Sequence, residues 1–224
     1  MLAPSRHVED GRPVRWGGRP RQTCLVWTYR RCAATVLICR SFLVAMFAIR
    51  EYSMRMNLKP QDIVVVLKLL VSDKETSYSA LAYKLSMSPS EVHAAVKRAA
   101  VAGLIDAPTK EVKRKPLLEF LIHGLKYAFP PTRGTITRGL PTAHAAPPLS
   151  ELLSGKDDLP PVWSCADGTV RGHEFEPLYR CVPAAAREDA RLYELLVLVD
   201  AVRGGRARER KLAEEELRKR LESR

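Results

Sequence analysis

The residues of this chain that are best suited to chemistry are its cysteines and histidines, which suggest a metal site at first sight. Cys165, His173 and Cys181 follow one another at intervals of eight, with His123 and His144 upstream. Zinc prefers sulfur and imidazole ligands, but its sites usually contain close pairs such as CxxC or HxxxH, and the sequence has neither pair. We therefore expect no bound metal, and interpret these residues as buried thiols and surface histidines.

A second candidate is a repeated Arg-Gly pair, Arg133-Gly134 and Arg138-Gly139. Two interpretations are open: an anion-binding loop for an effector or a phosphate, or two turn glycines beside exposed arginines. Enzyme signatures are missing, because the sequence has no Walker loop, no GxSxG, no HExxH and no paired Cys/His nucleophile motif. We expect a protein that is not an enzyme and that uses no cofactor.

The composition describes a globular protein with an excess of positive charge. The 224 residues are 46% hydrophobic and carry 37 Lys+Arg against 25 Asp+Glu, a formal charge of +12. That hydrophobic content excludes a disordered chain or a fibre. A basic protein favours an anionic partner, but net charge does not locate the contact.

The basic residues are unevenly placed, because residues 1–55 hold ten Arg, no Lys and three acids, a charge of +7. A membrane anchor over Ala33–Ile49 is disfavoured by Arg40 near its centre. A basic arm that touches nucleic acid is a second interpretation. The third, which we adopt, is a disordered or over-extended leader before a start at Met54 or Met56.

An odd number of cysteines without CxxC indicates a reducing, cytoplasmic location.

Three helices are expected next. The apolar run 63–71 also fits a buried strand, but Pro60 in a first turn and Asp62 near a helix N-terminus favour a helix. Ser77 is placed to cap a short second helix. The third helix has the clearest start in the sequence, since Ser88-Pro89-Ser90-Glu91 combines an N-cap, a proline at the first position and a capping box.

The third helix should run to about Ala102, before Gly103 and a short apolar strand at Leu104-Ile105. Lys110–Lys115, with four cations and one acid, follows at the position of a wing. Three helices, a short turn, a strand and a basic wing are the order of a winged helix-turn-helix, which we place at residues 56–115.

Within that motif the third helix would read DNA from the major groove. Val92, Val96 and Ala99 recur at helical spacing and would face the core. Short side chains near the helix start would approach base edges, and long basic ones would reach phosphate. The predicted DNA-binding residues are Ser77, Ser88, Pro89, Ser90, His93, Ala94, Lys97, Arg98, Lys113, Arg114 and Lys115.

The stretch YSALAYKLSMSPSEVHAAVKRAAVAGLI, within Met56–Ile105, resembles the winged helix-turn-helix domains of bacterial MarR-like transcriptional regulators. Phe129–Leu149 and the ending LYELLVLVDAVRGGRARERKLAEEEL are similar to the C-terminal part of uncharacterised bacterial proteins that begin with this domain. MarR proteins flank the domain with long dimerisation helices and lack a Pro-rich middle. Their ligand sites are therefore not transferred to this chain.

The remainder is expected to be mainly helical, with one irregular segment. A linking helix should cover 116–128. Nine of the 16 prolines lie in 129–183, which excludes long helices there, although Thr169–Gly172 fits a short strand. Helical periodicity returns over 184–224 as a pair of helices.

These observations lead to two hypotheses. The first is a cytoplasmic, sequence-specific transcriptional regulator that binds double-stranded DNA as a homodimer. It would not associate with a membrane, and its effector would be an unknown small molecule or protein. The second is a non-enzymatic adaptor whose winged helix contacts protein. Salt-sensitive DNA binding would distinguish the first from the second.

Overall fold

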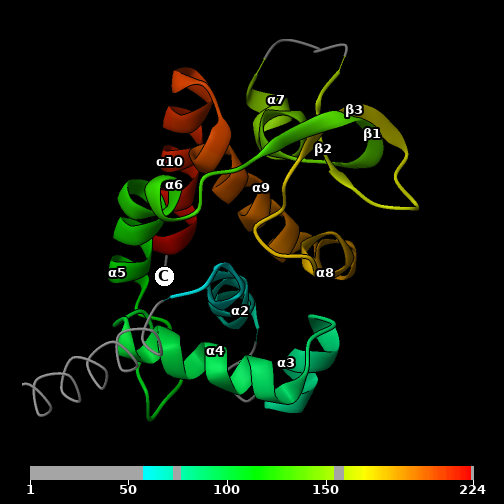
Figure 1. The fold of residues 1–224 in the computed structure, drawn as a ribbon. Helices are drawn as coiled ribbons and strands as arrows, with labels where there is room; N and C mark the ends of the chain where they lie inside the picture. Colours follow the sequence, from blue (N-terminus) through cyan, green and yellow to red (C-terminus); the bar gives the residue numbers. More distant parts are fainter. Residues whose placement is uncertain (1–57, 73–76, 154–158, 223–224) are drawn as a thin grey trace, which may run out of the picture. The chain divides into compact units, whose positions relative to one another are not determined.

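A computed structural model describes residues 58–72, 77–153 and 159–222, all within one compact unit. These residues form a mainly helical structure with a small three-strand mixed sheet, which confirms the predicted helical class (Figure 1). The three interpretations of residues 1–55 lie outside the described residues. None of the helices in the described part is long and apolar enough to cross a membrane.

Three helices come first, as predicted. Helix α2 (Pro60–Val71) begins with its proline, and the Asp62 carboxylate accepts a hydrogen bond from the Lys59 backbone N–H at 2.8 Å. This capping interaction shows why the β-branched run adopts a helix rather than a strand. Helices α3 (Tyr78–Lys84) and α4 (Pro89–Val101) follow. Helix α4 packs against both α3 and α2.

A small hairpin follows α4, closed by one bridge between Ile105 and Val112. The Lys113 N–H donates to the Leu104 carbonyl at 2.8 Å, which makes Lys113 the last hairpin residue. Helix α5 (Arg114–Glu119) then starts two residues earlier than expected. It continues through the π-helical turn η1 (Phe120–Gly124) into α6 (Leu125–Ala128).

The segment 129–183 contains the whole sheet, so its prediction as irregular is corrected. Strand β1 (Arg133–Pro141) is antiparallel to β2 (Pro161–Ser164) and to β3 (Val170–Phe175), while β2 and β3 pair in parallel. Pro141 is the last residue of β1 and Pro161 the first of β2, positions at strand ends that tolerate a proline. Between β1 and β2 the chain forms the 3-10 turn η2 (Ala143–Ala145) and the short helix α7 (Leu149–Leu152).

Two glycines allow the strands to approach closely. A Cβ on Gly139 would lie 2.0 Å from the Trp163 carbonyl oxygen, and one on Gly172 would lie 1.8 Å from that of Pro160. No larger residue fits at either position without movement of the backbone. Thus Gly139, which the sequence suggested as a turn residue, is required inside a strand.

The chain ends in three helices rather than two: α8 (Val182–Glu188), α9 (Ala190–Gly204) and α10 (Ala207–Glu222). Asp189 separates the first two and caps α9 by accepting from the Arg191 and Leu192 N–H groups at 3.0 and 3.1 Å. Figure 1 shows α2 between α4 and α9. Helix α9 is the central element, because it packs against α2, α8 and α10 and its residues 195–203 are buried.

A partly buried ion pair joins α2 to the N-cap residue of α9. The Lys68 ammonium lies 2.7 Å from the Asp189 carboxylate and is 5% exposed. Burial alone would raise the pKa of Asp189, but the hydrogen bond and charge of Lys68, with the two backbone N–H donors, leave this pKa below its usual value. Helix α2 is thereby held to the start of α9.

A second buried cluster surrounds Asp200 on α9. One carboxylate oxygen accepts from the Trp163 indole N–H at 2.6 Å and from the Thr142 hydroxyl at 3.0 Å. The other accepts from Arg203 at 2.7 Å. Burial raises the pKa of Asp200 against the opposing effect of these donors. The cluster connects α9 to β2 and to the end of β1.

Candidate nucleic-acid interface

Helix α4 begins with the capping box that its sequence predicts. The Ser88 hydroxyl accepts from the Glu91 N–H at 3.2 Å, and the Glu91 carboxylate accepts from the Ser88 N–H at 2.9 Å. Hydrogen bonds from the Ser88 backbone and hydroxyl lower the pKa of Glu91. Ser88, Pro89 and Ser90 are all exposed, so the first turn is open to solvent.

The two faces of α4 have different chemistry. The buried face contains Val92, Val96 and Ala99, as predicted, together with Ala95. The predicted outer face is exposed at Ser90, His93 and Lys97, whereas Ala94 is half-buried. The outer face therefore presents small side chains at its start, His93 one turn later and the cation Lys97 two turns later.

Arg98 differs from the expectation that it reaches phosphate. Its guanidinium donates to both carboxylate oxygens of Asp62, from Nε at 2.8 Å and from Nη2 at 2.6 Å. Asp62 is fully buried and the Arg98 side chain is only 14% exposed. The hydrogen bond from Arg98 to this carboxylate raises the arginine pKa. Arg98 is thus an internal partner that locks α4 to α2.

Tyr78 of α3 contacts both the hairpin and α4. The Lys110 ammonium lies 4.2 Å from the centre of the Tyr78 ring, and the His93 ring meets Tyr78 edge-on at 5.4 Å between centroids. Such cation–π contacts fix the position of a loop beside a helix. Ser77, just before Tyr78, caps α3 by accepting from the Ala80 N–H at 3.2 Å.

Three of the four cations of the predicted wing lie at the end of the hairpin and in the helix that follows it. Lys113 ends the hairpin, and Arg114 and Lys115 belong to the first turn of α5. Lys113 and Lys115 are exposed, but Arg114 is half-buried and donates to the Leu221 carbonyl at 3.3 Å. The sequence does not show where the hairpin ends and α5 begins, so the predicted wing extended to Lys115, into the first turn of α5.

Two residues that the sequence did not identify lie beside the start of α4. The Tyr179 hydroxyl is 3.4 Å from the Glu91 carboxylate, and an Arg180 nitrogen is 4.0 Å from it. They come from the loop before α8, 88 residues away in sequence in the case of Tyr179. No local signal could have revealed this long-range contact.

The candidate metal residues are separated. Cys181 is buried, which raises its pKa to about 11, and Cys165 accepts a hydrogen bond from Arg187 at 3.1 Å. His144 lies 3.6 Å from the Glu209 carboxylate. In the described part of the chain, no group of three His, Cys, Asp or Glu side chains is placed to hold a metal ion. His123 and His173 are exposed.

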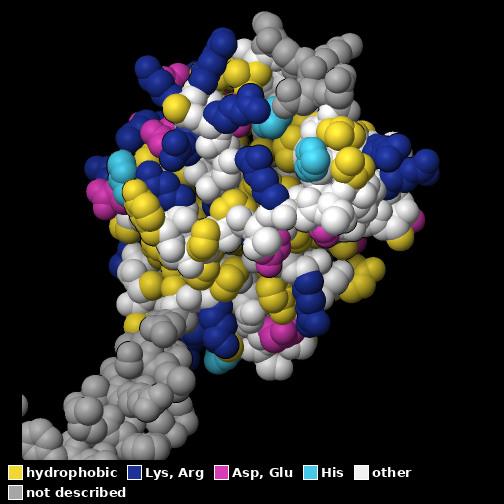
Figure 2. All heavy atoms as spheres, turned by 45° about the horizontal axis from the view of Figure 1, so that its top comes forward, with side chains coloured by type: hydrophobic (Ala, Val, Ile, Leu, Met, Phe, Trp, Pro, Cys, Tyr) yellow, Lys and Arg dark blue, Asp and Glu magenta, His cyan; other side chains and the backbone are white. Residues whose placement is uncertain are grey.

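The repeated Arg-Gly pairs lie in strand β1, so neither the loop nor the turn interpretation holds. Arg138 faces Arg171 across the β1–β3 ladder, while Arg133 donates to the Gly204 carbonyl at 2.9 Å. Figure 2 shows the face that includes the top of Figure 1. On it, Lys and Arg side chains form several separate groups with hydrophobic side chains between them, not one continuous basic surface.

Comparisons of the chain with protein-family models, with curated proteins and with solved structures found no match.

Proposed function

We propose that the chain is a double-stranded DNA-binding transcriptional regulator in which α2, α3, α4 and the 104–113 hairpin act as a winged helix-turn-helix. Helix α4 would enter the major groove, and the hairpin would lie beside the backbone. The observation that carries this proposal is the open, capped first turn of α4, followed by His93 and Lys97 on the same exposed face. A homodimer would read two half-sites about 34 Å apart.

The charges beside α4 support a modest electrostatic contact. Lys97, Lys113 and Lys115 are exposed, and Lys97 projects from the face that would meet the groove. The aliphatic stem and free ammonium of each lysine suit phosphate contacts, which position a protein without reading sequence. The burial of Arg98 removes one expected contact, so specific affinity would depend more strongly on the dimer.

We expect Lys97→Ala to weaken DNA binding and to flatten its dependence on salt. One lost phosphate contact should reduce the slope of log K against log salt by about 1. Fluorescence anisotropy with a labelled random duplex, measured over a series of salt concentrations, gives both values.

The matched control is Lys211→Ala, which removes an exposed lysine from α10. This variant should keep the wild-type slope. Equal slopes for wild type and Lys97→Ala would show that the outer face of α4 does not contact DNA.

An adaptor function is the alternative. It is favoured by apolar side chains on this part of the surface, since Val101 on α4 is 49% exposed and Tyr83 on α3 is 84% exposed. Aromatic and apolar groups of this kind are enriched in protein–protein contacts. Absence of any salt-sensitive binding in the same titration would support the adaptor and reject the DNA-binding proposal.

A further inference from the structure

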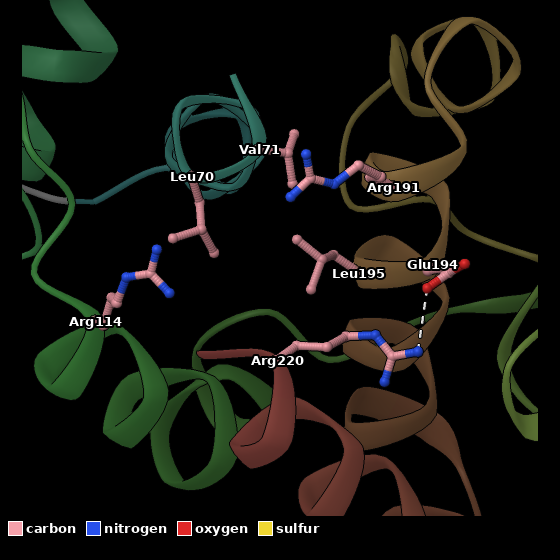
Figure 3. A pocket seen from close by; sticks show the side chains of 7 residues that line it. All are labelled: Leu70, Val71, Arg114, Arg191, Glu194, Leu195 and Arg220. Atoms are coloured by element: carbon pink, nitrogen blue, oxygen red, sulfur yellow. Dashed lines mark hydrogen bonds and ion pairs between the residues drawn. The ribbon is translucent and has the colours of Figure 1, made fainter. Parts of the chain in front are cut away.

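A hollow of about 280 Å³ lies between the end of α2, the start of α5 and the helices α9 and α10 (Figure 3). Its lining contains no residue of α4, but it includes Arg114, one of the residues that the sequence predicts to bind DNA. Four elements meet around it. A ligand that entered it would contact the first helix and the last helix of the described chain at once.

Three arginines surround this hollow. Arg114 comes from the start of α5, Arg191 from the first turn of α9 and Arg220 from α10. Figure 3 shows their guanidinium groups around one space. Three positive charges on the wall of one hollow favour an anionic ligand over a neutral or a cationic one.

The acids near the hollow neutralise only one of these arginines. Arg220 pairs with Glu194 at 3.1 Å and also with Glu216, which is on its own helix. Among the described residues, Arg114 donates only to the Leu221 backbone carbonyl. Arg191 has no ion pair with any acid in the described part of the chain, and its side chain is exposed. Two guanidinium charges are therefore available to a ligand.

Apart from Glu194, which pairs with Arg220, the rest of the wall is apolar. Leu70 and Val71 at the end of α2 are half-buried, and Leu195 on α9 closes the floor. Ligand sites commonly combine apolar walls with a few convergent polar groups that fix orientation. An inorganic anion would satisfy the arginines here but leave the leucines and the valine uncovered.

We infer that this hollow binds a small organic anion, a carboxylate with an aliphatic body, with its head group on Arg191 and Arg114 and its chain against Leu70, Val71 and Leu195. Arginine suits this role because its planar fork binds carboxylate in a bidentate manner. Binding at this site can be measured without DNA, so the outcome does not depend on the DNA-binding proposal.

Octanoate is a suitable probe, titrated into the full chain by calorimetry without DNA. Arg191→Gln should raise the dissociation constant by roughly tenfold or more, because its charge-assisted contact with the carboxylate is lost. Arg191 donates no side-chain hydrogen bond within the described structure, so this variant should fold normally. The matched control is Arg218→Gln, an exposed arginine of α10 outside the hollow, which should keep the wild-type constant.

Two further ligands test the two halves of the site. Octanol should bind much more weakly than octanoate, and inorganic phosphate should also bind more weakly. Saturable octanoate binding should raise the unfolding temperature of the wild type more than that of Arg191→Gln. Equal octanoate affinity in wild type and Arg191→Gln would overturn the proposal, as would octanol or phosphate binding as tightly as octanoate.

Discussion

Replacement of Arg98 by alanine is expected to lower the free energy of unfolding by about 3–5 kcal/mol, because it leaves the buried Asp62 carboxylate without its charge partner. The backbone N–H of Lys59 would remain as its one hydrogen-bond donor outside the helix. Urea denaturation followed by far-UV circular dichroism measures this loss. DNA binding by the variant would fall as well, but through the loss of folded protein.

Lys97→Ala is the adjacent control, since Lys97 is an exposed cation of the same helix. It should change the unfolding free energy by less than about 0.5 kcal/mol. Arg98→Lys retains a charge but not the bidentate geometry, and should fall between the two. Should Arg98→Ala be as stable as Lys97→Ala, the Arg98–Asp62 pair would not hold α4 to α2.

The second large effect is expected at Asp200, where alanine should also cost about 3–5 kcal/mol. Arg203, whose side chain is 3% exposed, would lose its only acidic partner in the described structure, and the Trp163 indole would lose its acceptor. Arg203 would keep two backbone carbonyls, those of Phe129 and Glu176, which do not compensate its charge. The same urea titration reports this loss.

Asp167→Ala provides the comparison, because Asp167 forms an ion pair with Arg187 but is 81% exposed. Exposed pairs contribute at most about 1 kcal/mol. Asp200→Asn keeps an oxygen that can accept from the indole and so isolates the effect of the charge. A similar cost for Asp200→Ala and Asp167→Ala would contradict the role assigned to the buried cluster.

The elements that the sequence predicts correctly are those with local signals. The capping box at Ser88 and Glu91 needs only four consecutive residues, and it sets the start of α4. The apolar spacing of Leu192, Leu195 and Val199 likewise predicts α9 from within one helix. Each of these features depends only on residues within one or two helical turns of one another.

The features that could not be predicted depend on partners far away in the chain. Strand β1 has a polar, glycine-containing sequence, and it becomes a strand through pairing with β2 and β3. Arg98 looks like a surface residue at helical spacing, because its partner Asp62 is 36 positions away. Periodicity predicted the buried face of α4 correctly. It could not distinguish the exposed Lys97 from Arg98, which is paired with Asp62.

The central claim is that the outer face of α4 reads double-stranded DNA, and selection of bound duplexes from a random pool tests it most directly. The wild type should enrich a common sequence, arranged as two half-sites about one helical turn apart. The matched variant Lys97→Ala should recover less of the pool, while Lys211→Ala should match the wild type. A pool that stays random through successive rounds, with no salt-sensitive retention of DNA, would contradict the account.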